Sequence, residues 1–193
     1  MTDTPSHADE PAYARVAFQG ALGAFSHEAC LALRPWDEAV PHATFAEALA
    51  ALTSGDCDMA LIPVENSSIG AVEPAATLVR ESGLAVLADV WRPIRHALMS
   101  VEGARLADIR SVESHPIALA QCAATLKTMH LKVIEHFDTA GAARDVAEAG
   151  DMTRAAIAPV GAAEVYGLSI LRNDLQDSSD NRTRFLLLGV SQG

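Results

Sequence analysis

The sequence predicts an α/β fold with two lobes and a cleft between them, and three observations lead to this prediction. Short apolar segments of strand character alternate with helical segments along most of the chain, which favours largely parallel sheets covered by helices. A strand-rich stretch at 84–100, interrupted by Pro93, is the natural crossing from one lobe to the other. A final apolar strand at 182–188 follows a polar stretch and returns the chain to the first lobe.

The first half of the chain supplies the elements of lobe 1. A strand at 14–18 precedes a helix at 25–33, for which Ser26 is the expected N-cap. The next elements expected are a strand at 42–45, a helix at 46–52, a strand at 59–64 and a helix at 73–81. Lobe 1 then comprises about 13–90 and 172–193, after a polar, acidic tail at 1–12 that we expect to be disordered.

The middle of the chain, about 91–171, supplies lobe 2. A strand at 109–112 precedes a helix at 116–129, which carries proline at its first position. The elements that follow are a strand at 131–135, a helix at 139–149, a strand at 155–158, a helix at 161–166 and a segment at 168–171 that leads out of the lobe. Ligands of such folds bind beyond the carboxyl ends of strands and between lobes, so functional residues are expected there.

The composition excludes several classes of protein. The 193-residue chain has a formal net charge of −11, which argues against binding to nucleic acid or to an anionic membrane. It has no apolar run near the roughly 20 residues that a membrane-spanning helix needs, and no secretory signal at its start. Its three cysteines show no C-x-x-C spacing, so neither a zinc site nor a disulfide framework is expected. A reducing cytoplasm is the simplest location.

The run Asn181-Arg182-Thr183-Arg184-Phe185 places polar side chains where the last strand begins. Burying such groups without partners costs about 1–3 kcal/mol each, so either the fold or a ligand must satisfy them. In a regular strand Thr183 and Phe185 share one face and Arg184 lies on the other. Either the strand is irregular there and Arg184 holds an anionic ligand, or Arg184 anchors carboxylates on the opposite face.

Four more polar runs lie at predicted strand ends, helix starts or helix ends. Asn66 and Ser67 follow a buried strand, where they suit either a simple turn or a ligand. Ser114 is the expected cap of the helix that carries Gln121, and Thr139 opens another helix. Two helix N-termini facing one cleft would attract an anion without any lysine. The fifth run, at 163–168, closes a helix.

In this order and spacing the five runs resemble the catalytic domain of prephenate dehydratases, over blocks that extend from Arg15 to Gly189. The resemblance implies an architecture like that of type II periplasmic binding proteins and the conversion of prephenate to phenylpyruvate, with loss of carbon dioxide and water. It implies no metal and no organic cofactor. Two positions depart from the common family pattern: Ala21 replaces a frequent proline and Ile117 a frequent glutamine.

The resemblance also assigns site residues. It implies that Thr183 is the catalytic residue, which polarises the departing hydroxyl. The substrate-binding residues that it implies are Asn66, Ser67, Ser114, Gln121, Thr139, Arg184 and Phe185, with His115 and Ser26 as further candidates.

Two other functions fit the same residues. Arogenate dehydratase performs the same chemistry on the amino-acid analogue, and a non-catalytic protein that binds small anions could share the two-lobed shape. The family resemblance implies a lyase of phenylalanine biosynthesis and a tendency to form homodimers. Because the sequence ends at Gly193, just after the last strand, we expect no regulatory domain for phenylalanine within it.

Overall fold

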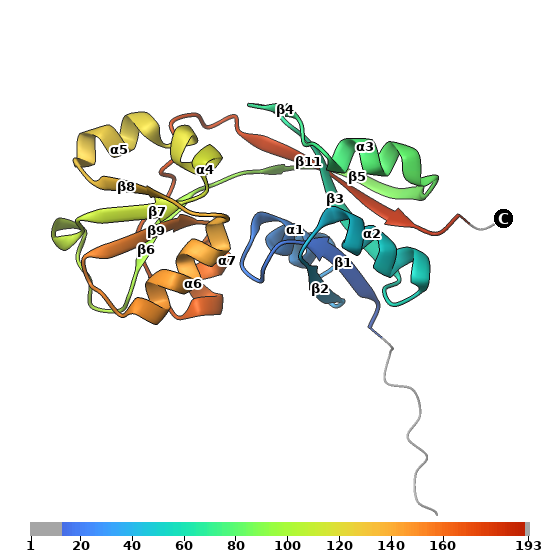
Figure 1. Ribbon diagram of the computed structural model, residues 1–193, viewed down its shortest axis with the longest axis horizontal. Helices are drawn as coiled ribbons and strands as arrows, with labels where there is room; N and C mark the ends of the chain where they lie inside the picture. The colour runs from blue at the N-terminus through green and yellow to red at the C-terminus, as the bar shows by residue number, and fades with distance from the viewer. Residues whose placement is uncertain (1–12, 192–193) are drawn as a thin grey trace, which may run out of the picture.

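The structure, a computed structural model, describes residues 13–191 and divides them into two α/β lobes, each built on its own sheet (Figure 1). The two-lobed α/β fold expected from the sequence is therefore confirmed. The disordered tail expected at 1–12 lies outside the described residues. Between residues 13 and 191, no helix is both long and apolar enough to cross a bilayer.

Lobe 1 is a sheet in the order β2-β1-β3-β11-β5, with the short β4 paired to β3. Its central strands β1 and β3 run parallel, whereas β11 lies antiparallel between β3 and β5. The strands are β1 (Arg15–Gln19), β2 (Glu38–His42), β3 (Met59–Asn66), β4 (Gly70–Ala71), β5 (Ala85–Pro93) and β11 (Arg182–Gly189), and the helices are α1 (Phe25–Leu33), α2 (Phe45–Ser54) and α3 (Ala75–Ser82). The last strand thus enters the sheet beside the strand that carries Asn66.

Lobe 2 is a sheet in the order β10-β6-β9-β7-β8, in which β7 runs parallel to both of its neighbours. Its strands are β6 (Ala97–Ser100), β7 (Ser111–Ser114), β8 (Lys132–Glu135), β9 (Arg154–Ala158) and β10 (Ser169–Arg172). Its helices are α4 (Pro116–Gln121), α5 (Ala123–Met129), α6 (Thr139–Ala149) and α7 (Val160–Tyr166), with a 3₁₀ turn at Leu106–Asp108.

The chain crosses between the lobes twice, and the two crossings lie side by side (Figure 1). The Ile94 N–H donates to the Asn181 carbonyl at 2.8 Å, and the Leu175 N–H donates to the His96 carbonyl at the same distance. These bonds join the outgoing segment at 94–96 to the returning segment at 173–181. Residues about eighty to ninety positions apart in the sequence are therefore held together at the junction of the lobes.

Three differences from the expected elements are the largest near the cavity. The helix expected at 116–129 is broken at Cys122, because the Asp177 carboxylate accepts hydrogen bonds from the Ala124 and Thr125 N–H groups and caps a new helix. The strand expected at 42–45 lies instead at Glu38–His42, because Thr44 forms a capping box that starts α2.

The third difference is at the first helix. Ala24 occupies the N-cap of α1, so Ser26 lies inside the first turn rather than before it.

Each sheet has an apolar cluster on each of its two faces, as the apolar sequences of its strands suggest. In β3, Ala60 and Ile62 point to one cluster with α2 and α3, whereas Leu61 points to another with α1. Phe18 and Phe185 pack in the second cluster and are almost completely buried. This packing anchors the first half of β11, where the polar residues of interest lie.

The lobes also touch directly, through α1 and the loop before it on one side and α7 on the other. The Gly161 N–H donates to Glu28 at 2.7 Å, and the Tyr166 hydroxyl donates to the Leu22 carbonyl at 2.8 Å. Gly23 lies so close to Ala162 that a Cβ on this glycine would be 2.8 Å from the Ala162 Cα. This contact holds the lobes together at one end of the cleft.

We expect a substitution of Gly23 by Ala to destabilise the protein more than the same substitution at Gly83. Both glycines have φ in the left-handed region, +83° and +65°, but a Cβ at Gly83 would meet no atom within 4 Å. Gly83→Ala should cost about 1–2 kcal/mol, the usual penalty for an L-residue in that conformation. Gly23→Ala adds the clash with Ala162. Urea unfolding of the two variants measures the difference, and equal losses would argue against the inter-lobe contact.

Candidate active site

A cavity of about 290 Å³ lies between the lobes, and residues from both lobes line it. Its size is near the lower end of the range for small-molecule sites. Apolar side chains dominate the wall, with Phe25, Phe45 and Phe185 among them. The polar residues in the wall are Gln19, Ser26, Asn66, His96, His115, Gln121, Asp138, Thr139 and Thr183. The cavity therefore suits a small ring-containing ligand with a few polar groups.

The fold brings together seven of the ten site residues expected from the sequence. The residues that line the cavity are Ser26, Asn66, His115, Gln121, Thr139, Thr183 and Phe185. The other three, Ser67, Ser114 and Arg184, are outside its wall. Thr183 and Phe185 share one side of β11, as a regular strand requires, even though the pairing of β11 with β3 shifts register just after Arg184.

Asn66 holds the hydroxyl of Thr183 in a defined orientation. The two residues face each other across β3 and β11, and both are more than nine-tenths buried. The Asn66 Nδ2 donates to Thr183 Oγ1 at 2.9 Å and to Asn181 Oδ1 at 3.0 Å. Since the Thr183 oxygen accepts a hydrogen bond from Asn66, its own hydrogen remains free for another acceptor.

The remaining capacity of the Asn66 side chain is used by the loop that follows β3. Its Oδ1 accepts from the Ser68 N–H at 2.9 Å and from the Ile69 N–H at 3.3 Å. Asn66 therefore lines the cavity with an amide whose hydrogen bonds are all made within the protein. In the described residues it positions Thr183 rather than offering a free amide to a ligand.

Arg184 lies on the opposite face of β11, the second of the two alternatives that the sequence left open. Its guanidinium donates two hydrogen bonds to Asp89, at 2.8 and 2.6 Å, and one to Glu65 at 3.4 Å. The hydrogen bonds with Asp89 raise the pKa of Arg184 and lower that of Asp89. With both carboxylates as partners, Arg184 ties β11 to β3 and β5 outside the cavity.

Ser114 and Ser67 are outside the cavity because main-chain groups hold their side chains. The Ser114 hydroxyl is fully buried and donates to the Ile157 carbonyl at 2.6 Å, which joins β7 to β9. The Ser67 hydroxyl donates to the Asp180 carbonyl and accepts from the Arg182 N–H. The cap of α4 is not Ser114 but His115, whose Nδ1 accepts from the Ile117 N–H at 3.2 Å.

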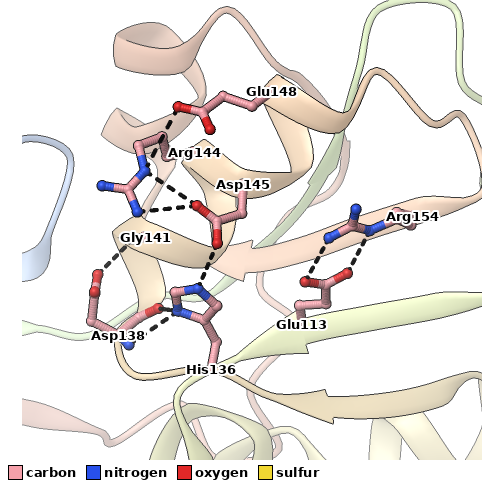
Figure 2. A network of polar contacts seen from close by, with 8 residues as sticks. All are labelled: Glu113, His136, Asp138, Gly141, Arg144, Asp145, Glu148 and Arg154. Atoms are coloured by element: carbon pink, nitrogen blue, oxygen red, sulfur yellow. Dashed lines mark hydrogen bonds and ion pairs between the residues drawn. The ribbon is translucent and has the colours of Figure 1, made fainter.

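A network of polar contacts surrounds the start of α6 (Figure 2). Asp138 and Thr139, at this start, line the cavity. Asp138 caps the helix by accepting from the Gly141 N–H, and the His136 Nδ1 lies 2.9 Å from the Asp138 carbonyl. The His136 Nε2 is 3.0 Å from Asp145, which also pairs with Arg144. This network fixes the turn that presents Asp138 and Thr139 to the cavity.

The start of α1 offers unoccupied main-chain donors to the same cavity. Ala24 at its N-cap makes no side-chain capping bond, and Ala24, Phe25 and Ser26 all line the wall. The first N–H groups of a helix attract an anion when no side chain caps them. Ser26, which the sequence suggested as a cap, instead lies in the first turn of α1 and lines the same wall.

His96 is the main residue of the wall that the sequence did not predict. Only 2% of its surface is exposed, and its Nε2 lies 2.8 Å from Gln121 Oε1. The signal that could have found it is a histidine just before an apolar run, inside the predicted crossing at 84–100. Gln19 and Asp138 also line the cavity without having been predicted.

The stability of the protein should depend on the protonation of His96. Burial lowers its pKa from the usual 6.5, and the hydrogen bond to Gln121 opposes this only in part. Well above pH 6.5 the histidine is neutral in both folded and unfolded states, so its contribution to stability is constant. As the pH falls below 6.5 the unfolded state takes up the proton first, and stability is lost. Urea unfolding between pH 7.5 and 5 should show a shallower loss for His96→Gln than for wild type; identical slopes would contradict this expectation.

Within residues 13–191, other side chains are poor candidates for a metal site or for a nucleophile. No cluster of three or more His, Cys, Asp or Glu side chains has a geometry suited to a metal ion. The three cysteines are buried and unpaired. Burial raises the pKa of Cys30 and Cys122 to about 12, so neither is a thiolate nucleophile near neutral pH.

Comparison with known proteins gives a family match over nearly the whole chain. A family model described as prephenate dehydratase matches residues 16–192. A bifunctional N-acyl-homoserine lactone acylase/prephenate dehydratase from Komagataeibacter europaeus is 38% identical over 172 residues, which are 89% of this chain and 61% of the relative. Arogenate dehydratase/prephenate dehydratase 2 from Arabidopsis thaliana, a chloroplastic protein, is 41% identical over 174 residues, which are 90% of this chain and 46% of the relative.

Solved structures show the same fold. A prephenate dehydratase from Arthrobacter aurescens in complex with L-Phe superposes with a TM-score of 0.82 at 29% identity, over 93% of this chain and 61% of that one. The quorum-quenching acylase GqqA superposes with a TM-score of 0.86 at 37% identity, over 93% of this chain and 65% of that one. The chain spans about half the length of the plant relatives that it matches.

Proposed function

Since the chain belongs to the prephenate dehydratase family, we propose that it removes carbon dioxide and water from prephenate to form phenylpyruvate. The observation that carries this proposal is the orientation of Thr183, whose hydroxyl hydrogen is free at the wall of an inter-lobe cavity. The reaction is a lyase step of aromatic amino-acid biosynthesis. We also propose a cytoplasmic location and a homodimer, which cell fractionation and sedimentation would test.

Thr183 acts on the hydroxyl that leaves the ring. As the ring carboxylate departs as carbon dioxide, its bonding electrons enter the ring, the ring becomes aromatic, and the carbon–oxygen bond at the opposite carbon breaks. The departing oxygen gains negative charge, and a preoriented O–H donor stabilises that charge more than it stabilises the substrate. The hydroxide then takes a proton from solvent, so water is the second product.

Neutral donors hold the two carboxylates of the substrate. None of the wall residues in the described part of the chain is Lys or Arg, so main-chain dipoles and amides must serve. The start of α1 with Ser26 is one such site, and Thr139 and Gln121 on lobe 2 supply others. Helix dipoles and N–H groups bind anions without adding net charge, which fits a chain of formal charge −11.

The apolar wall holds the ring and excludes water. Phe25 and Phe185 approach from lobe 1, and Ile117 and Ala118 from lobe 2. A ligand must contact both lobes at once to fill this space. Low polarity around the ring strengthens the hydrogen bond from Thr183, because fewer water molecules compete for the departing oxygen.

Arogenate is the second candidate substrate, and one observation favours it. Asp138 lines the cavity, and its Oδ2 makes no hydrogen bond within the described residues, although its Oδ1 caps α6. A free carboxylate oxygen would attract the ammonium group of arogenate and repel the side-chain oxygens of prephenate. Several relatives carry the name arogenate dehydratase, so the comparison with known proteins leaves both substrates within the family.

One relative is also named an N-acyl-homoserine lactone acylase, but the residues of this cavity support that activity less well. Amide hydrolysis through Thr183 would require a base that removes its proton. The contact that Thr183 Oγ1 makes in the described residues is with a donor, the Asn66 amide. A hydroxyl in this setting is suited to donate a hydrogen bond, not to attack a carbonyl.

Turnover by the purified chain tests the proposal. Prephenate and arogenate are supplied separately at equal concentration, and phenylpyruvate and phenylalanine are quantified; an acyl-homoserine lactone forms a third assay. Faster formation of phenylpyruvate from prephenate supports the proposal. Faster formation of phenylalanine from arogenate would show that arogenate, not prephenate, is the substrate. Unchanged recovery of all three compounds would leave a small-anion binding protein as the better description.

A further inference from the structure

His96 occupies a buried position in the cavity wall, and the reaction described above gives it no role. It lies between β5 and β6, and the ring of Phe25 from lobe 1 meets it edge-on with 5.2 Å between centroids. Its hydrogen bond to Gln121 joins two residues that line the same cavity. Burial keeps the imidazole neutral near pH 7, so its proton is on one nitrogen only.

The surroundings of the two ring nitrogens decide which one carries the proton. The buried Nδ1 has no hydrogen-bond partner within the described residues, whereas Nε2 lies 2.8 Å from Gln121 Oε1. A proton on Nδ1 would bury an unpaired donor, and buried orphan N–H groups are rare. The proton is therefore on Nε2, and the Gln121 oxygen accepts it.

The direction of this bond decides what Gln121 shows to a ligand. With Oε1 turned toward His96, the amide nitrogen of Gln121 is the group left available to a ligand. No residue between 13 and 191 accepts a hydrogen bond from this nitrogen. Without His96, the amide could rotate and present its oxygen instead. A glutamine in the wall then changes from a donor to an acceptor, with opposite consequences for an anionic ligand.

The returning segment fixes both residues of the pair at their main chains. The His96 N–H donates to the Gln176 side chain, and the His96 carbonyl accepts from the Leu175 N–H, both at 2.8 Å. The Asp177 N–H donates to the Gln121 carbonyl at 2.8 Å. Three consecutive residues of one segment thus set the distance between His96 and Gln121.

We propose that His96 is a positioning residue, which orients the Gln121 amide so that its N–H groups donate to an oxygen of the bound substrate. The pair would select a carboxylate or keto oxygen at this point of the cavity and reject an ammonium group, which is itself a donor. This inference rests on the proposed function for the choice of ligand. It predicts that His96 acts on substrate binding and only through Gln121.

Steady-state kinetics with prephenate tests the proposal. His96→Leu, which has no donor, should raise KM about 10-fold with a smaller effect on kcat, the loss expected for one hydrogen bond to the ligand. His96→Gln, whose amide can again donate to Gln121, should recover most of this loss. The double variant His96→Leu/Gln121→Ala should have the KM of Gln121→Ala alone. Additive increases in KM, or no recovery by His96→Gln, would overturn the proposal.

A second measurement does not depend on turnover. The ¹⁵N chemical shifts of the His96 ring at pH 7.5 should show a protonated Nε2 and an unprotonated Nδ1 in the wild-type protein. A protonated Nδ1 would overturn the proposal, even if His96→Leu failed to fold. If wild type does not convert prephenate, the proposed function fails by itself, and the ring shifts still decide whether His96 orients Gln121.

Discussion

Replacing Thr183 with Ala is expected to lower kcat for prephenate by at least about 100-fold, the loss seen when one preorganised donor is removed from a developing anion. KM should change much less, because the hydroxyl acts mainly when the carbon–oxygen bond breaks. The hydrogen bond from Asn66 holds this hydroxyl in place in the folded protein, so no reorganisation is needed during the reaction.

Two further substitutions separate the hydrogen bond from the shape of the side chain. Thr183→Ser keeps a hydroxyl within reach of Asn66 and should retain activity within about 10-fold of wild type. Thr183→Val keeps the branched shape but has no donor, so it should behave like Thr183→Ala. Near-normal turnover by a folded Thr183→Ala protein would remove Thr183 from the mechanism, and equal activities of the Val and Ser variants would show that shape alone matters.

Converting Asn66 to Asp is expected to lower kcat at pH 7 by about 100-fold, because it reverses the hydrogen bond to Thr183. A carboxylate only accepts, so the Thr183 hydroxyl would donate to residue 66 and turn its hydrogen away from the substrate. The N–H groups of Ser68 and Ile69 can still donate to the side chain, which favours retention of the loop.

The pH dependence of this variant provides a sharper test. Protonation of the buried carboxyl group at acid pH restores a donor toward Thr183, so the ratio of variant to wild-type kcat should rise as the pH falls. Asn173→Asp makes the same change at an exposed position and controls for the added charge. A folded Asn66→Asp protein with wild-type kcat at pH 7 would show that Asn66 does not orient the hydroxyl.

The alternation of strands and helices was enough to predict the two lobes. The spacing of apolar residues within each segment indicates whether that segment forms a strand or a helix, and this spacing is local to the segment. The helix at 139–149 was predicted with its observed bounds, since Asp138 and Gly150 supply local start and stop signals. Local alternation in β11 also placed Thr183 and Phe185 on one side of the strand and Arg184 on the other.

Long-range contacts explain the differences. Serine is typical of a helix cap and of a turn, as expected for Ser114 and Ser67. Their hydroxyls instead donate to main-chain carbonyls 43 and 113 residues away. The helix expected at 116–129 breaks because Asp177, more than fifty residues later, caps its second half. No local pattern encodes such partners.

By itself, the sequence determined the fold class, the crossing between lobes and the strand that carries Thr183, because these follow from hydrophobic period and local turn chemistry. Only the tertiary structure decided which polar groups are satisfied by the protein and which remain free. It engages Asn66 fully, directs Arg184 to Asp89 and adds His96 beside Gln121. The physical reason is that hydrogen-bond satisfaction depends on neighbours in space, and packing brings those neighbours from distant parts of the chain.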